Sequence, residues 1–228
     1  MNLLCGSFAV VVALMYNDLT LAFWLIVAGI VFDFFDGFVA RLLHSSSAIG
    51  VQLDSLADVI TSGLAPAAVL WQVCLQTEPC WLPETWKLGY GVFVLAAFSA
   101  LRLAKFNIDE TQTVEFCGLP TPAGSLLCAS LGMLWQQGAV ALSSDGVLLI
   151  AVLTSLLLVS PIRVFALKFH GFGWRGNEVR YLFLLASIVL IIILRTYAIP
   201  VIIVLYIVVS AVRWLCMRSG NPDKAPKA

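Results

Sequence analysis

Four aspartates stand at a fixed spacing in an otherwise apolar part of the chain. Asp33 and Asp36 are three residues apart, and Asp54 and Asp58, four residues apart, follow after a short gap. A carboxylate at membrane depth costs about 2.5–3.5 kcal/mol on insertion scales, so such groups are rare there and usually functional. Four neighbouring carboxylates also repel one another unless cations bind between them. The cluster therefore predicts a metal site.

The expected ligands are all oxygen atoms, because no cysteine or histidine accompanies the aspartates at this spacing. Such a set suits Mg²⁺ or Mn²⁺, with Ca²⁺ as another occupant. Four carboxylates with waters are enough for two ions about 3.5–4 Å apart, the arrangement used for phosphoryl chemistry. The cofactors predicted from this pattern are therefore two divalent cations.

Small and basic residues accompany the aspartates. Gly37, Ala40 and Gly50 permit the close approach of a bulky ligand or of another helix. Arg41 offers a fork of donors to phosphate oxygens. Helix packing is an alternative explanation for each glycine alone, and a charge that fixes membrane topology is an equal alternative for Arg41.

Two helices must position these side chains. On a helix, Asp33 and Asp36 share one face, and Asp54 and Asp58 share another. Residues 44–47 are polar and short enough for a tight turn between the two helices. The helices are therefore predicted to be antiparallel neighbours, whose aspartate faces converge near one membrane surface.

The composition is that of an integral membrane protein. Of the 228 residues, 61% are hydrophobic and 11% are charged, whereas soluble domains have about 25% charged residues. The formal net charge is zero, which gives no indication of a nucleic-acid partner. We predict an all-α membrane protein with eight transmembrane segments, at about Leu3–Tyr16, Leu19–Leu42, Leu53–Val73, Leu88–Phe106, Ala123–Val140, Val147–Leu167, Tyr181–Leu194 and Ala198–Leu215.

The basic residues predict the orientation. If the N-terminus is inside and eight helices alternate, the outer loops hold only Lys87 and Arg195. The inner loops then hold Arg41, Arg102, Lys105, Arg163, Lys168, Arg175, Arg180, Arg213, Arg218, Lys224 and Lys227. This asymmetry places both termini and the aspartate ends of the helices in the cytoplasm, so a protein of the cytoplasmic membrane is expected.

One membrane-embedded domain is expected over residues 1–218, and residues 219–228 are predicted to be a disordered tail. The first segment has no cleavage-site pattern, so no removable signal peptide is expected. Six cysteines include no C-x2-C pair. Cys74 and Cys80 flank the first outer loop, where either a disulfide or two free thiols would fit.

The aspartate pattern resembles the signature of the CDP-alcohol phosphatidyltransferase family. It reads D-x2-D-G-x2-A-R-x8-G-x3-D-x3-D from Asp33 to Asp58, and every fixed position is present. The resemblance implies a six-helix catalytic core, a divalent-metal site, a homodimer, and transfer of a phosphatidyl group from a CDP-linked lipid to an alcohol with release of CMP.

The resemblance also implies roles for individual residues. Asp33, Asp36 and Asp54 correspond to metal ligands, and Asp58 to the general base, which also reaches a metal. Asp58 lies about one helical turn beyond Asp54, where it is free to take a proton from the incoming hydroxyl. The expected contacts of the CDP-lipid are Asn2, Gly37, Ala40, Arg41 and Gly50.

Three further stretches resemble the phosphatidylserine synthase branch of this family: Asn2–Gly6, Leu101–Asn107 and Phe116–Gly124. The branch implies CDP-diacylglycerol and L-serine as substrates. Serine has a carboxylate, which Arg102 and Lys105, one helical turn apart, can bind, and Thr121 offers a hydroxyl nearby. Both cations can instead be topology charges, and Thr121 can instead bond to its own helix.

Two other functions remain open from the sequence. Another member of the family would use glycerol phosphate or inositol phosphate as acceptor, and would call for more basic residues than this chain has. A cation-coupled transporter would favour midplane sites, broken helices and an internal repeat. The aspartates are instead confined to one hairpin, with no matching pattern in the second half.

Overall fold

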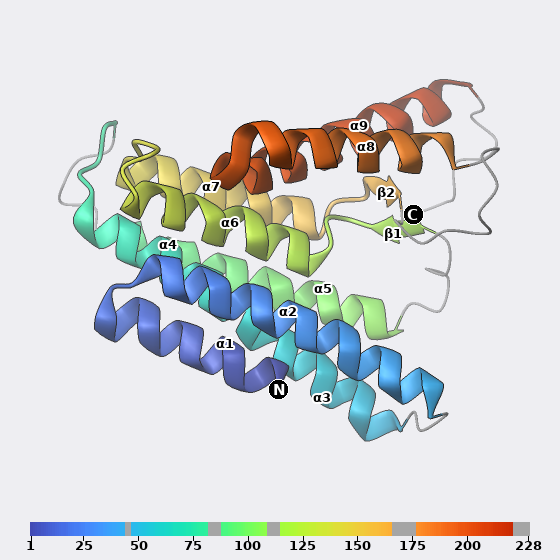
Figure 1. Ribbon diagram of the computed structural model, residues 1–228, viewed down its shortest axis with the longest axis horizontal. Helices are drawn as coiled ribbons and strands as arrows, with labels where there is room; N and C mark the ends of the chain where they lie inside the picture. The colour runs from blue at the N-terminus through green and yellow to red at the C-terminus, as the bar shows by residue number, and fades with distance from the viewer. Residues whose placement is uncertain (44–46, 82–87, 109–114, 166–176, 221–228) are drawn as a thin grey trace.

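The computed structural model describes residues 1–43, 47–81, 88–108, 115–165 and 177–220 (Figure 1). Helices make up nearly all of this part of the chain. In order, the elements are α1 (Asn2–Val11), η1 (Val12–Tyr16), α2 (Leu19–Leu42), α3 (Ala48–Asp58), η2 (Val59–Leu64), α4 (Ala65–Gln76), η3 (Leu88–Phe93), α5 (Val94–Ile108), β1 (Glu115–Cys117), α6 (Thr121–Gln136), α7 (Ser144–Leu158), β2 (Arg163–Phe165), α8 (Glu178–Leu194), η4 (Arg195–Tyr197) and α9 (Ala198–Gly220).

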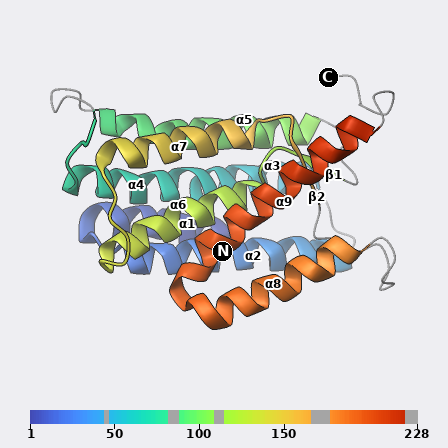
Figure 2. The ribbon, with the colours of Figure 1, turned by 90° about the horizontal axis from the view of Figure 1, so that it is seen from above.

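The helices run roughly along one common axis, as expected for a bundle within a membrane (Figures 1 and 2). Each predicted apolar segment overlaps a helix or an unbroken run of helices. In the described residues, four stretches are long and apolar enough to cross a membrane: Leu19–Val39, Ile49–Gln76, Gly89–Ile108 and Val179–Cys216. The last contains both α8 and α9, between which the chain turns at Arg195, with φ of 49°. The protein is therefore an integral membrane protein.

One predicted segment was too long, and another lies within a longer helix. The apolar segment predicted from about Leu53 belongs to a helix that begins at Ala48, because the Ser47 side chain caps it and accepts a hydrogen bond of 3.0 Å from the Gly50 N–H. The sixth segment was predicted to continue to Leu167, but α7 ends at Leu158. Pro161 follows, and it has no N–H with which to continue a helix.

A small sheet of two three-residue strands stands where that predicted helix would have ended, within an otherwise helical fold in the described residues. Strands β1 and β2 pair antiparallel, with Phe116 opposite Val164. The pairing continues where the Gly118 N–H donates to the Ile162 carbonyl at 2.9 Å. Gly118 adopts a φ of 77°, and a side chain there would collide with the Leu158 carbonyl. The sheet lies where β1 leads into α6 and α7 leads into β2 (Figure 1).

The helix that begins with α3 changes from α-helical to π-helical hydrogen bonding directly after Asp58. Residues Val59–Leu64 form a π-helical turn between α3 and α4. Pro66 lies just beyond it and cannot donate to the Ser62 carbonyl, which interrupts the α-helical ladder there. The turn is buried, with Thr61, Ser62 and Gly63 in the protein interior. Such turns are frequent at functional sites, and nothing in the apolar pattern predicted this one.

Helix α1 packs closely against both aspartate-bearing helices. A side chain at Gly6 would collide with Thr61 of η2, and one at Gly29 of α2 would come within 2.6 Å of the Thr61 methyl carbon. The Thr61 hydroxyl donates to the Asn2 carbonyl at 3.2 Å. The two glycines therefore let α1, α2 and η2 meet at one level, and this contact places the start of α1 between α2 and α3.

Candidate active site

The side chain of Asn2 joins the two aspartate-bearing helices. Its amide nitrogen, Nδ2, donates to Asp33 Oδ1 of α2 at 3.1 Å and to Asp58 Oδ1 of α3 at 2.9 Å. Asn2 is 4% exposed, and the two carboxylates are half-buried. The antiparallel arrangement of α2 and α3 thus brings Asp33 and Asp58 to the same amide, as the sequence predicted for two converging faces.

Asp54 belongs to the same group of carboxylates, and Asp36 stands apart. The Asp54 side chain is within hydrogen-bonding reach of Asp33. Its negative charge repels the carboxylates of both Asp33 and Asp58. Asp36 is 61% exposed, and its Oδ2 lies 3.6 Å from the Met1 amino group. Asp33, Asp54 and Asp58 are therefore the nearer neighbours and Asp36 stands apart, and a metal site shared by all four stays a prediction.

In the described residues, no group of three or more acidic, cysteine or histidine side chains is arranged as a ready metal cage. The donor set nevertheless fits a divalent cation, because Asp33, Asp54 and Asp58 supply carboxylate oxygens from facing helices. Their mutual repulsion is opposed by a neutral amide from Asn2 and by the more distant charge of Arg102. A cation bound between them would remove this repulsion.

The two glycines of the signature have different surroundings. A side chain at Gly37 would meet nothing within 4 Å, so helix packing does not require glycine there. At Gly50 a side chain would come within 3.1 Å of Ser47 Oγ, the capping atom of α3. Gly37 thus leaves space beside the aspartates, while Gly50 also serves the local cap. Ala40 and Arg41 continue α2, and their side chains lie outside the described part of the structure.

The predicted acceptor residues also meet. Arg102 of α5 donates from Nη1 to the hydroxyl of Thr121, the first residue of α6, at 2.9 Å. Thr121 is 1% exposed. Its hydroxyl is therefore directed at the guanidinium of Arg102 rather than at its own helix. The Nε atom of Arg102 is buried and has no hydrogen-bond partner among the described residues.

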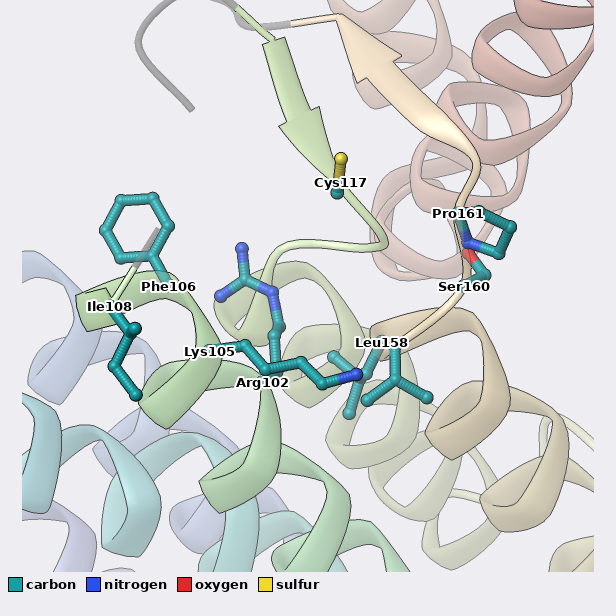
Figure 3. A pocket seen from close by; sticks show the side chains of 9 residues that line it. Arg102, Lys105, Phe106, Ile108, Cys117, Leu158, Ser160 and Pro161 are labelled. Carbon is teal, nitrogen blue, oxygen red and sulfur yellow. The ribbon is translucent and has the colours of Figure 1, made fainter. Parts of the chain in front are cut away.

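Arg102 and Lys105 line a cavity of about 380 Å³ (Figure 3). Both rise from the end of α5, and the residues after α7 form the opposite wall. The other lining residues are Phe106, Ile108, Cys117, Leu158, Val159, Ser160 and Pro161. The cavity is thus apolar on most sides, with two cations from one helical turn on one side, and a small anionic group would be the fitting occupant.

One side chain connects this cavity with the aspartates. The positive charge of Arg102 acts on the Asp58 carboxylate from beyond ion-pair distance. A second link lies nearby, where Asn107 Nδ2 of α5 donates to the Ser55 hydroxyl of α3 at 2.8 Å. The end of helix α5, which carries the two cations of the cavity, is therefore held against α3, the helix that carries the predicted general base.

Two residues that shape the site were missed in the sequence. Thr61 and Gly29 hold Asn2 in place, yet neither lies in the signature or beside a predicted site residue. The sequence did contain a signal for this contact, because Thr61, Ser62 and Gly63 are two hydroxyl residues and a glycine in succession within an otherwise apolar helix. Cys74 and Cys80, whose pairing was left open, are both free thiols, and Cys74 Sγ lies 3.6 Å from the Ser144 carbonyl.

The paired aspartate helices and the cavity at the end of α5 together form the candidate active site of this membrane protein. The sequence model of the family described as CDP-alcohol phosphatidyltransferase matches residues 1–162. The chain therefore belongs to the CDP-alcohol phosphatidyltransferase family. This membership decides against the transporter alternative and agrees with the family signature at residues 33–58.

Three similar proteins from different bacteria share the name CDP-diacylglycerol–serine O-phosphatidyltransferase. The chain is 32% identical over 170 residues to the CDP-diacylglycerol–serine O-phosphatidyltransferase of Bacillus subtilis strain 168, covering 75% of this chain and 88% of that protein. It is 31% identical over 200 residues to the enzyme of that name in Helicobacter pylori strain 26695, with 86% and 80% covered. For the enzyme of that name in Mycobacterium tuberculosis H37Rv, identity is 34% over 220 residues, with 89% and 73% covered.

Proposed function

We propose that this protein is a phosphatidylserine-forming transferase. It transfers the phosphatidyl group of CDP-diacylglycerol to the hydroxyl of L-serine and releases CMP. The observation that carries the proposal is the position of Arg102, which lines the cationic cavity and whose charge also acts on Asp58 from beyond ion-pair distance. An acceptor held there by its carboxylate would have its hydroxyl near that aspartate. The names of the relatives and their coverage of most of the chain support the same reaction.

Asp58 is the proposed general base. It is half-buried, lies in the last turn of α3, and its Oδ1 accepts from the Asn2 amide. That hydrogen bond fixes the carboxylate so that one of its oxygens faces the acceptor. The carboxylate takes the proton of the serine hydroxyl as this oxygen attacks phosphorus in line.

Asp33, Asp36 and Asp54, with Asp58, are the proposed ligands of two divalent cations, Mg²⁺ or Mn²⁺. When bound, such cations neutralise the charge of the pyrophosphate and of the leaving CMP. The exposed position of Asp36, beside the open space at Gly37, suits a ligand that closes on the cation only when the lipid substrate is present. We also propose that Asn2, Gly37, Ala40, Arg41 and Gly50 contact the CDP-lipid.

The acceptor residues divide into two kinds. Arg102 and Lys105 face the cavity and are proposed to bind the serine carboxylate, with the unpartnered Nε of Arg102 as one donor. Thr121 is buried and bonded to Arg102, so its proposed part is to orient the guanidinium. A phosphorylated acceptor would carry two negative charges, which these two cations could also attract, so the acceptor must be tested directly.

The arrangement in the membrane follows from the same proposal. In the described part, residues 1–162 form six helical segments. In chain order, they are α1–η1, α2, α3–η2–α4, η3–α5, α6 and α7. We propose that these form the six-helix catalytic core, that α8 and α9 add two further crossings, and that the active site faces the cytoplasm. A homodimer is expected from the family resemblance. Residues 221–228, most of the proposed tail, lie outside the described residues.

A transfer assay tests the proposal. The purified protein in detergent–lipid micelles is given CDP-diacylglycerol, Mg²⁺ or Mn²⁺, and labelled L-serine. Parallel reactions replace serine with glycerol 3-phosphate or inositol phosphate, and a further reaction contains EDTA. We expect labelled lipid and CMP in equal amounts with serine alone, and none in EDTA.

Each other outcome has a defined meaning. Transfer to a phosphorylated acceptor in place of serine would keep the family reaction and overturn the assignment of the cavity to a serine carboxylate. Full activity in EDTA would overturn the metal role of the aspartates. Absence of transfer to all three acceptors, from protein that remains monodisperse, would overturn the proposed function.

A further inference from the structure

Helix α5 runs antiparallel to the helix formed by α3, η2 and α4, and the two helices meet at two levels (Figure 1). Within the bundle, a side chain at Gly63 of η2 would come within 3.0 Å of Ser99 Cβ and 3.3 Å of Ala96 Cα. At the end of α5, Asn107 Nδ2 donates to Ser55 Oγ at 2.8 Å. The first contact is close packing that a glycine permits, and the second is a hydrogen bond between two side chains.

The two contacts keep the helices in one register. On the aspartate-bearing helix, Ser55 and Gly63 are eight residues apart. On α5, their partners Asn107 and Ser99 are also eight residues apart. Equal lengths of chain therefore lie between the two contacts on both helices, so each position on one helix has a matching level on the other.

This register brings the predicted general base to the level of the cationic cavity. Asp58 comes three residues after Ser55. Three residues before Asn107, α5 passes between Arg102 and Lys105, the two cations that line the cavity. Both intervals are α-helical and rise by the same amount per residue, so Asp58 lies level with these cations along the bundle.

We propose that Asn107 is a positioning residue for the transfer step, whose hydrogen bond to Ser55 keeps the acceptor cavity level with Asp58. This inference rests on the proposed function, because it takes serine as the acceptor and Asp58 as the base. The proposed cationic ligands of serine lie on α5, whereas the aspartates lie on α2 and α3. Their alignment therefore depends on how the end of α5 is held, although Asn107 touches neither substrate.

Loss of this hydrogen bond should affect the reaction step more than substrate binding. In Asn107→Ala the close packing at Gly63 remains, so α5 stays in the bundle while its end is less firmly held. In-line attack needs the hydroxyl and the base in alignment, and small displacements are costly. We expect kcat to fall about 3- to 10-fold, as for the loss of one hydrogen bond. The KM values for serine and CDP-diacylglycerol should stay within about twofold, because the groups proposed to bind each substrate are unchanged.

The partner residue provides a second variant and a conservative one. Ser55→Ala removes the hydrogen-bond acceptor and should lower kcat as much as Asn107→Ala does. Ser55→Thr retains a hydroxyl at the same position and should keep kcat within about twofold of the wild type. If both residues act through one hydrogen bond, the double variant Asn107→Ala with Ser55→Ala should be no slower than either single variant.

Gln76→Ala is the matched control. Gln76 Nε2 donates to Asn17 Oδ1 at 2.8 Å, which is another exposed hydrogen bond between side chains of two different elements. Gln76 is the last residue of α4 and therefore lies at the opposite end of the helix that begins with α3. A side-chain amide is removed in both cases, but kcat and both KM values should not change in Gln76→Ala.

The outcomes separate this inference from the proposed function. Serine transfer by the wild type with an unchanged kcat in Asn107→Ala would overturn the role of Asn107 alone. A raised serine KM with an unchanged kcat would show direct contact with the acceptor and would also overturn it. An equal loss of kcat in Gln76→Ala, or a Ser55→Thr variant as slow as Ser55→Ala, would do the same. Absence of serine transfer by the wild type would overturn both proposals.

Discussion

The two ends of the helix bundle hold buried or half-buried carboxylates in opposite surroundings. At one end, Asp145 is 5% exposed in the first turn of α7, and backbone N–H groups of Cys80, Trp81 and Gly146 donate to it at 2.7–3.1 Å. At the other end, Asp33 and Asp58 share one amide, that of Asn2. Both ends place carboxylates against apolar helices. Among these carboxylates, only Asp145 receives several hydrogen bonds from backbone N–H groups in the described residues.

The difference separates a structural carboxylate from a site. Asp145 ties the segment after α4 to the start of α7, and its oxygens are already occupied by donors. The carboxylates of Asp33, Asp54 and Asp58 face one another with fewer donors than their lone pairs could accept. Such a group is destabilising by itself and becomes stable when a cation and a substrate are bound. Substitutions should therefore have opposite effects at the two ends.

The largest effect is expected for Asp58→Asn. Loss of a general base lowers kcat about 10²–10⁴-fold, because the acceptor hydroxyl keeps its proton during attack. The melting temperature without metal should stay the same or rise, since one of the repelling carboxylates is gone. Turnover measured with saturating serine and CDP-diacylglycerol, beside a thermal melt, tests both statements. Activity within threefold of wild type would contradict the assignment of Asp58.

The sequence predicted the aspartate end far better than the surroundings of its residues. Spacing along two helices was enough to place Asp33 and Asp58 on converging faces, because helical geometry is local and regular. The contact of Gly6 and Gly29 with Thr61 depends on how three helices pack, and no periodicity reveals it. The π-helical turn after Asp58 was missed for the same reason, since apolar residues fill α- and π-helical turns equally well.

The next effect concerns the amide between the carboxylates. Asn2→Ala removes the donor shared by Asp33 and Asp58 and leaves both free to turn away. Partners that orient ligands typically change metal affinity or activity about 10–100-fold when lost. We expect a higher Mg²⁺ or Mn²⁺ concentration for half-maximal activity, measured by metal titration of the transfer reaction.

Asn17→Ala is the matched control for Asn2→Ala at the opposite end of the same rod. The Asn17 side chain exchanges hydrogen bonds with Gln76 at 2.8 and 3.2 Å, and its φ is 52°. Its loss should lower the melting temperature, because alanine is strained at positive φ. The metal titration should not move. An equal shift in metal requirement for both variants would contradict the distinction between the two ends.

A smaller effect is expected for Gly37→Ala. A methyl group there meets nothing within 4 Å, and alanine in a helix is favoured over glycine by roughly 0.5–1 kcal/mol. The variant should therefore melt slightly higher while its KM for CDP-diacylglycerol rises several-fold, because the space is proposed to hold the lipid substrate. Gly138→Ala also meets nothing within 4 Å, but its φ of 68° makes alanine strained, so stability should fall while both KM values stay unchanged. An unchanged lipid KM in Gly37→Ala would remove that glycine from the proposed site.

The residues proposed to bind the acceptor show how much of the site could be predicted from residue types alone. Arg102, Lys105 and Thr121 were predicted together from a resemblance and from the charge of serine, and the structure brings Arg102 to Thr121 and both cations to one cavity. The hydrogen bond from Arg102 to Thr121 depends on how α5 packs against α6, so residue types alone could not indicate it.

The smallest effect on activity, and the clearest effect on stability, is expected for Asp145→Asn. Hydrogen bonds from the Ser143 side chain and from the backbone N–H groups of Cys80, Trp81 and Gly146 lower the pKa of Asp145 from 3.8 to about 2. A carboxylate with a lowered pKa stabilises the fold fully above its unfolded pKa, and this contribution is lost as pH falls from about 4 toward 2.

The asparagine variant should therefore melt lower than the wild type at pH 7, by roughly 3–6 °C. The difference should shrink below pH 4, where the wild-type carboxylate itself begins to take up its proton. Transfer activity per folded molecule should equal that of the wild type, since the start of α7, which holds Asp145, lies at the opposite end of the bundle from α3 (Figure 1). Thermal melts at pH 7 and between pH 5 and 3, with activity at pH 7, test the prediction. A variant that is as stable as the wild type but inactive would show that this carboxylate, too, serves the reaction, and the contrast between the two ends would fail.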